Sequence, residues 1–374
     1  AGEPLMLTLD LTIQAAVERV LAGGMTVMNA KGAAAILMDA HTGEIISLAS
    51  LPDFDPNDRP SPLTTGFDPS ESPLFNRAVQ GVYELGSTFK IFAAAQALEM
   101  GLVNPNTMIN TRGPIRWGKH RINDFHDYGA ELTVSDVIVR SSNIGTARLA
   151  QQIGAANQRE FLDRLGFTKP TAIQLTEASG SQPLLPSNWS ELSTMRISYG
   201  HGLSASPLHL ATAYASLLNG GTRVTPTLVR TGPVAPGPRV VSERTSAVAR
   251  DMLRQVVASD HGTASFAEVA GYQVGGKTGT ADKPKPRGGY YDDKVIATFA
   301  SGDDIAIRPV QVKGLYPTAE KTEKAVYGYV GKLSALHPEM VLCLVYFPTS
   351  LSRSPRHIAW MPRPAIKQTS RGYR

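Results

Sequence analysis

Three short motifs bring together the residue types that an acyl-transfer site needs. A serine and a lysine stand three positions apart at Ser87 and Lys90, which is about one helical turn. A second hydroxyl and a carboxamide follow at Ser141 and Asn143, and a second lysine, Lys277, begins a Lys-Thr-Gly-Thr run. Each motif is short enough to arise by chance, so the prediction depends on their order within one chain.

The pair Ser87 and Lys90 has the pattern of an activated nucleophile. A serine in the first turn of a helix points its hydroxyl toward unpaired backbone N–H groups, where an oxyanion is stabilised. Lys90 lies on the same helix face and can accept the Ser87 proton, provided that burial and a nearby cation keep its amine neutral. The structural alternative is an N-cap serine followed by a solvated lysine.

Ser141 and Asn143 fall between two helical patterns, at 134–140 and 144–152, so we expect them on a turn between helices. Turn chemistry alone explains such residues in many proteins. Beside a nucleophile, a second hydroxyl can also relay a proton to a leaving amine, and a carboxamide can bind a substrate peptide and orient a lysine.

The run that begins at Lys277 has the alternation of a strand. In an extended chain Lys277 and Gly279 lie on one face, while Thr278 and Thr280 lie on the other. Gly279 has no side chain, so a ligand can approach the backbone there. The run therefore offers one cation and two hydroxyl donors next to exposed backbone.

Two glycine-rich segments imitate nucleotide-binding motifs. Residues 271–278 match the phosphate-loop pattern G-x-x-x-x-G-K-T, but the proline- and glycine-rich residues 279–289 cannot begin the helix which that loop requires. Residues 200–205 imitate a dinucleotide fingerprint, yet no acidic residue follows about 20 positions later. The eight histidines show no metal-ligand spacing. We therefore expect no nucleotide, no metal and no other cofactor.

The composition is that of a globular chain with a basic end. With 374 residues, 42% of them hydrophobic, the chain can bury a large core, and no apolar run approaches the roughly 18 residues of a membrane span. The net charge is +5, but residues 351–374 carry six Lys or Arg and no acids, which leaves 31 basic against 32 acidic residues before them. We expect this tail to be flexible, and we expect no nucleic-acid binding.

The hydrophobic patterns predict an α+β chain whose sheet is built from both ends, with helices between them. Residues 51–75 are crowded with Pro, Asp and Ser, and a loop this long suggests a functional surface. Cys343 is expected to be a buried thiol, and Met100 to face inward from its helix. Helices are expected at 10–28, 87–101, 144–152, 206–218 and 242–257, and strands at 33–39, 44–50, 274–280, 294–300 and 340–347.

With these motifs in order, the chain resembles a penicillin-binding protein, specifically the transpeptidase domain of a monofunctional class B member. The likeness covers about residues 5–300. The pair of segments 123–126 and 141–145 resembles the cell-division type, penicillin-binding protein 3, more than the elongation type. Further segments similar to those of the family are 7–14, 42–50, 76–79 with Tyr83, and 199–208.

The resemblance implies the penicillin-binding serine transpeptidase fold: a central antiparallel sheet flanked by helices, with a mostly helical subdomain. It implies one such domain over 1–350 and a separate basic tail. The implied activity is a serine D-Ala-D-Ala transpeptidase that cross-links peptidoglycan stem peptides in septal cell-wall synthesis and is a β-lactam target. The implied partners are cell-division membrane proteins, including a glycosyltransferase. The implied location is the periplasmic face of the bacterial inner membrane, through an N-terminal anchor outside this sequence.

The resemblance also assigns roles in the acyl transfer, by matching motif. Ser87 is the acylated nucleophile, Lys90 is its base, and Ser141 is the proton relay. The backbone N–H groups of Ser87 and Thr280 form the oxyanion hole. The donor loses its terminal D-Ala, and an amine of a neighbouring stem resolves the acyl-enzyme.

The same carry-over assigns the substrate contacts. Asn143 holds the donor stem peptide, and Lys277 supplies positive potential. Thr278 and Thr280 bind the terminal carboxylate, and Gly279 between them completes the motif.

Some segments depart from the family pattern. Leu85 stands where the family usually has proline. Residues 301–326 lie between two alternatives for the strand after Lys-Thr-Gly, either 295–300 or 327–330, and the resemblance fades after 347.

Competing functions stay open at this point. A class A β-lactamase would need a deacylating glutamate between the second and third motifs, and no Glu-x-x-Leu-Asn segment occurs there. A penicillin sensor or another β-lactam-hydrolysing relative fits the N-terminal segments less well. A non-catalytic division scaffold would use residues 301–374 for partners, but intact Ser87 and Lys90 argue against it.

Overall fold

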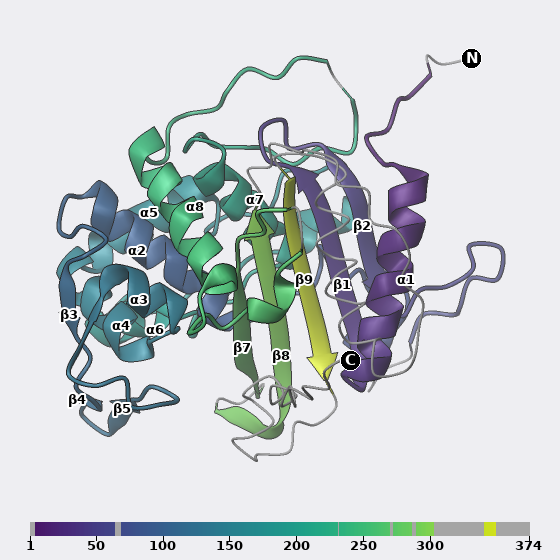
Figure 1. Ribbon diagram of the computed structural model, residues 1–374. Helices are drawn as coiled ribbons and strands as arrows, with labels where there is room; N and C mark the ends of the chain where they lie inside the picture. The colour runs from purple at the N-terminus through teal and green to yellow at the C-terminus, as the bar shows by residue number, and fades with distance from the viewer. Residues whose placement is uncertain are drawn as a thin grey trace, which may run out of the picture.

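A five-stranded antiparallel sheet in the order β2-β1-β9-β8-β7 forms the centre of the computed structural model (Figure 1). The structure describes residues 4–63, 69–230, 232–269, 272–285, 289–302 and 340–348. Because β1 pairs with β9, the two ends of the chain share one sheet, as the sequence predicts. The strands are β1 (Ala30–Asp39), β2 (Ile45–Leu51), β7 (Gly276–Pro284), β8 (Tyr290–Gly302) and β9 (Met340–Pro348).

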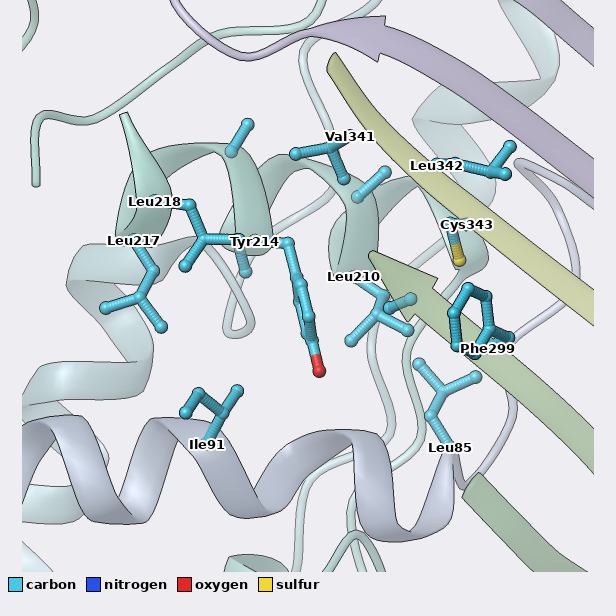
Figure 2. Close-up of a cluster of buried hydrophobic side chains, with 14 of the residues drawn as sticks. Leu85, Ile91, Leu210, Tyr214, Leu217, Leu218, Phe299, Val341, Leu342 and Cys343 are labelled. Carbon is cyan, nitrogen blue, oxygen red and sulfur yellow. The ribbon is translucent and has the colours of Figure 1, made fainter. Parts of the chain in front are cut away.

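Helix α7 (Pro207–Leu218) lies at the centre of the hydrophobic core. All of its residues are buried, and it contacts three strands of the sheet as well as α8 (Glu243–Ala258). Figure 2 shows Tyr214 extending from α7 toward the helix that carries Ile91, amid side chains from the sheet such as Phe299. On β1 and β2 packs α1 (Leu11–Val27), whose first turn is capped by the Asp10 carboxylate.

A mostly helical subdomain is inserted between β2 and β7, as expected (Figure 1). Its first helix, α2, is almost wholly buried, and the rings of Phe89, Phe92, Phe167 and Tyr214 pack against one another beside it. Its helices are α2 (Lys90–Glu99), α3 (Val134–Val139), α4 (Asn143–Ile153), α5 (Ala155–Leu165) and α6 (Glu191–Ser198).

This subdomain also contains two small two-stranded antiparallel sheets. β3 (Met108–Asn110) pairs with β6 (Glu131–Thr133), and β4 (Ile115–Trp117) pairs with β5 (His120–Ile122). The second pair is held by a small separate core in which Ile115 and Ile122 pack on α4 and α6.

Most predicted elements are confirmed within one to four residues of their ends. The exceptions have local causes. The helix expected from residue 87 begins as the 3-10 segment η2 (Gly86–Phe89), and Met100 is 42% exposed rather than inward, because α2 ends at Glu99. The strand expected at 274–280 begins at Gly276 and continues to Pro284.

The strand that follows Lys-Thr-Gly is the earlier of the two alternatives, because residues 295–300 pair with β7. Cys343 is fully buried on β9, as predicted. Residues 303–326, the alternative strand at 327–330 and the basic tail at 351–374 lie outside the described residues. No helix among the described residues has both the length and the apolar character needed to cross a membrane.

Candidate active site

Two buried lysines meet at one serine hydroxyl. The Lys90 Nζ atom lies 3.0 Å from Ser141 Oγ and 2.5 Å from the Ser141 carbonyl oxygen. The Lys277 Nζ atom lies 3.0 Å from the same Oγ and donates to the Thr278 carbonyl oxygen. Both lysines are 0% exposed. The structure therefore unites one residue from each of the three motifs.

Burial lowers the pKa of both amines. Desolvation, and then the neighbouring charge of Lys277, hold the pKa of Lys90 well below its usual value, against the opposing effect of Asp124. Desolvation also lowers the pKa of Lys277 to about 7. The lowered pKa increases the fraction of neutral Lys90 amine at a given pH, and the neutral amine is the form that general-base action requires.

Ser87 lies one turn before Lys90, in η2, at the start of α2. Its side chain is half-buried and makes no hydrogen bond to any other described residue. Tight backbone contact shapes this segment, because Gly86 has φ +58° and its N–H donates to the Gly200 carbonyl oxygen at 3.1 Å. The packing explains why a 3-10 turn, rather than an α-helix, presents the Ser87 hydroxyl.

Strand β7 passes directly beside this segment. A Cβ atom built on Gly86 would lie 2.5 Å from the Thr280 carbonyl oxygen. One built on Gly279 would lie 2.2 Å from Thr298 Oγ1 and 2.6 Å from the Leu85 carbonyl oxygen. A side chain at residue 279 would therefore push β7 away from the segment that carries Ser87, which explains the glycine of the third motif by packing.

Thr278 and Thr280 occupy different environments on β7. The Thr278 side chain is buried, with its hydroxyl 3.0 Å from Thr263 Oγ1, whereas Thr280 is half-exposed. On the opposite face of the strand, Lys277 points to Ser141. The alternation expected for this run is therefore present.

The turn that carries Ser141 is strained and firmly held. Ser141 has φ +64°, which is unusual for a residue with a side chain and is often found at functional sites. Asp124 holds the next residues, because its carboxylate accepts from the Ser142 hydroxyl at 2.7 Å and from the backbone N–H groups of Asn143 and Ile144. The Asn143 amide donates to the Asn123 carbonyl oxygen, not to a lysine.

Asp124 belongs to none of the three motifs that predict the site. It lies 18 positions from Ser142, so no short motif joins them. The only sequence signal is an acidic residue in the segment 123–126, which the family comparison already singled out.

A second buried polar group that none of the motifs includes is Glu84, three residues before Ser87. Glu84 is 5% exposed, and its Oε1 atom accepts from the Gly202 N–H at 2.7 Å and from the Tyr290 hydroxyl at 3.2 Å. The Arg196 guanidinium donates to that same hydroxyl at 2.9 Å. Desolvation raises the pKa of Glu84, and desolvation lowers the pKa of His201 to about 4. The contacts tie the nucleophile segment to α6 and to the start of β8.

The site is built from hydroxyl, amine and amide groups. Among the described residues, no group of three or more His, Cys, Asp or Glu side chains is arranged to hold a metal ion. The geometry supplies a hydroxyl at Ser87, a buried amine whose pKa is lowered, a second hydroxyl between two amines, and a close-packed strand. Such a set can carry out acyl transfer through a serine ester.

Comparison with known proteins gives a consistent result. The family model described as penicillin binding protein transpeptidase domain matches residues 33–307. A protein of Caulobacter vibrioides named probable peptidoglycan D,D-transpeptidase FtsI is 38% identical over 305 residues, which cover 80% of this chain and 50% of that protein. The Escherichia coli K12 peptidoglycan D,D-transpeptidase FtsI is 32% identical and covers 80% and 49%. The chain thus spans about half the length of these relatives.

Solved structures share the fold. The transpeptidase domain of penicillin-binding protein 3 from Burkholderia pseudomallei has a TM-score of 0.73 at 28% identity, covering 94% of this chain and 90% of that one. Penicillin-binding protein 3 from Mycobacterium tuberculosis, without ligand, has a TM-score of 0.75 at 30% identity, covering 93% and 74%. The same protein has also been solved in complex with aztreonam and with ampicillin.

Proposed function

Because this chain belongs to the family of penicillin-binding protein transpeptidase domains, we propose that it is a serine D,D-transpeptidase that cross-links peptidoglycan stem peptides during septal wall synthesis. The observation that carries the proposal is that Lys90 and Lys277 meet at the Ser141 hydroxyl. Lys90 itself lies one turn after Ser87. An activated serine ester is the chemistry that this arrangement supports best.

Acylation begins with Ser87. Its oxygen attacks the carbonyl carbon of the D-Ala-D-Ala bond, and its proton passes to the neutral Lys90 amine. The backbone N–H groups of Ser87 and Thr280 stabilise the oxyanion. When the C–N bond breaks, Ser141 delivers a proton to the departing D-Ala amine and regains one from Lys90. An ester of Ser87 and free D-Ala are formed.

Deacylation reverses the proton path with a different amine. The amino group of a neighbouring stem peptide attacks the ester carbon and gives its proton, through Ser141 and Lys90, back to the Ser87 oxygen. Asn143 binds the donor stem, and its partly exposed side chain supports this role. Lys277 supplies positive potential, and Thr278 and Thr280 bind the terminal carboxylate beside Gly279.

The cellular setting belongs to the same proposal. We place this activity in cell division at the periplasmic face of the inner membrane, with division membrane proteins that include a glycosyltransferase as partners. The relatives named peptidoglycan D,D-transpeptidase FtsI support the activity itself. The β-lactam complexes of a structural relative support β-lactams as ligands of this site. A non-catalytic scaffold is disfavoured because the Ser87, Lys90 and Ser141 arrangement is intact.

The decisive experiment is the intact mass after brief exposure to benzylpenicillin. We expect one adduct per chain that persists for hours, and we expect no adduct on Ser87→Ala. Ser61→Ala, an exposed serine on the long loop, is the matched control and should acylate like the parent. A quickly cleared adduct with drug hydrolysis would indicate a β-lactamase. No adduct on the parent would indicate a scaffold, and either result would overturn the proposal.

A further inference from the structure

The short hairpin formed by β4 and β5, here called the basic hairpin (residues 115–122), carries an unpaired positive charge cluster. Arg116, Lys119 and Arg121 are all exposed, as is His120. None of them forms an ion pair with another residue in the part of the chain that the structure describes. The helical subdomain presents this hairpin at its outer edge (Figure 1).

The arrangement of the charges costs stability. The register places Arg116 directly opposite Arg121, and like charges in a cross-strand pair repel each other. Each strand has only three residues, and so short a hairpin has little stability of its own. Its anchors are the buried Ile115 and Ile122. Facing arginines destabilise the hairpin when only water surrounds them. An anionic ligand that neutralises the charges would remove this repulsion, so a ligand explains the cluster better than solvent does.

An exposed aromatic ring narrows the class of ligand. Trp117 is 39% exposed and faces His120 across the hairpin. An indole ring presents a flat apolar face, and beside cations this suits a polymer that combines sugar rings with carboxylates.

The position of the hairpin connects it to the candidate active site. The chain leaves β5 at Ile122 and reaches Asn123 and Asp124 at once, and these two residues hold the turn that carries Asn143. A polymer that occupies the site next to Asn143 therefore has a short path to the basic hairpin.

We propose that the basic hairpin is a binding subsite for the carboxylate-bearing peptidoglycan strand, outside the acyl-transfer centre. The identity of the polymer rests on the proposed function, whereas the presence of an anion-binding surface rests on the charges alone. Arg116, Lys119 and Arg121 bind stem-peptide carboxylates, and Trp117 packs on a sugar ring.

The test compares two triple variants with the same change in formal charge. Arg116→Gln/Lys119→Gln/Arg121→Gln removes the cluster. Arg19→Gln/Lys31→Gln/Arg244→Gln removes three exposed cations outside the helical subdomain and serves as the control. The probe is a soluble, uncross-linked peptidoglycan strand with free stem carboxylates, and the comparison probe is the same strand with its carboxylates amidated.

We expect the hairpin variant to bind the carboxylated strand about tenfold more weakly, while the control variant changes less than twofold. Amidated strands should bind parent and hairpin variant alike, and added salt should weaken the parent's binding. Trp117→Ala should weaken binding to both strands. The rate of acylation by benzylpenicillin should stay within twofold in every variant.

Three binding results, and one acylation result, would overturn the inference. The binding results are unchanged strand binding by the hairpin variant, an equal loss in the control, and parent binding to phosphatidylglycerol vesicles as tight as to the strand, which would indicate a membrane surface. A loss of acylation in the hairpin variant would show that the hairpin acts on the site instead. If the parent itself is not acylated, the proposed function fails, and the strand measurement still tests the hairpin.

Discussion

At the scale of single residues, Ser141 organises the candidate site. Its hydroxyl oxygen has two lone pairs, and both amines can donate to it, which leaves its proton free to move toward a substrate. Its left-handed backbone, rare for serine, places that oxygen between the two lysines. Lys277 then has an electrostatic effect besides any contact with substrate, because its charge lowers the pKa of Lys90.

This coupling predicts a pH shift. In Lys277→Met the neighbouring charge is gone, so the pKa of Lys90 rises toward its ordinary value. Since only the neutral amine acts as a base, the rate of penicillin acylation should begin to rise at a pH about one unit higher. The measurement is the acylation rate constant against pH, with the exposed and remote Lys31→Met as the control. A slower reaction with an unmoved acid limb would show that Lys277 acts through binding alone.

At the scale of elements, the nucleophile depends on two backbones in contact. The segment 84–87 packs against 200–202, with the Gly86 N–H donating to the Gly200 carbonyl oxygen and the Gly202 N–H donating to Glu84. Strand β7 closes the other side. The position of the Ser87 hydroxyl is thus set by packing between elements, and it does not depend on the helix dipole alone.

Gly200→Ala tests that contact. The new Cβ would lie 1.9 Å from the Gly86 carbonyl oxygen, at a residue with φ +84°. We expect a loss of about 3 kcal/mol in the free energy of unfolding and at least a tenfold slower acylation, because the nucleophile segment must move. Gly180→Ala, where a Cβ meets open space, should change neither quantity noticeably. The measurements are the free energy of unfolding by denaturant titration and the rate of penicillin adduct formation. If Gly200→Ala behaves like the parent in both, the contact does not position the segment that carries Ser87.

At the scale of the whole molecule, α7 joins the sheet to the helical subdomain. Its buried Tyr214, labelled in Figure 2, donates to the Thr88 carbonyl oxygen at 2.8 Å. One hydrogen bond therefore links the core helix to the residue after Ser87. Burial raises the pKa of Tyr214, which keeps the phenol protonated as a donor.

Tyr214→Phe leaves that carbonyl oxygen without its donor while the ring still fills the core. We expect the free energy of unfolding to fall by about 1–2 kcal/mol, measured by urea titration. Tyr272→Phe, whose partly buried ring makes no hydroxyl hydrogen bond to another described residue, should stay within about 0.5 kcal/mol of the parent. Equal stability of the parent and Tyr214→Phe would mean that this hydrogen bond contributes nothing to joining the two parts.

Features that depend on near neighbours along the chain can be predicted from the sequence alone. Asp10, Ser206 and Ser242 cap the helices that their patterns predict, because a cap acts on N–H groups two or three residues away. The alternation at Lys277 and the fully buried Cys343 likewise follow from strand periodicity and local apolar character.

Which of these residues come into contact depends on the folded chain. Ser141 is 51 positions from Lys90 and 136 from Lys277, and contact over such separations comes from packing that no local pattern encodes. For the same reason the roles of Asp124 and Glu84 can be recognised only in the fold, because each accepts hydrogen bonds from backbone N–H groups far along the chain. The lowered pKa values of the two lysines depend on this packing too, because burial arises only when the sheet and the helical subdomain close around them.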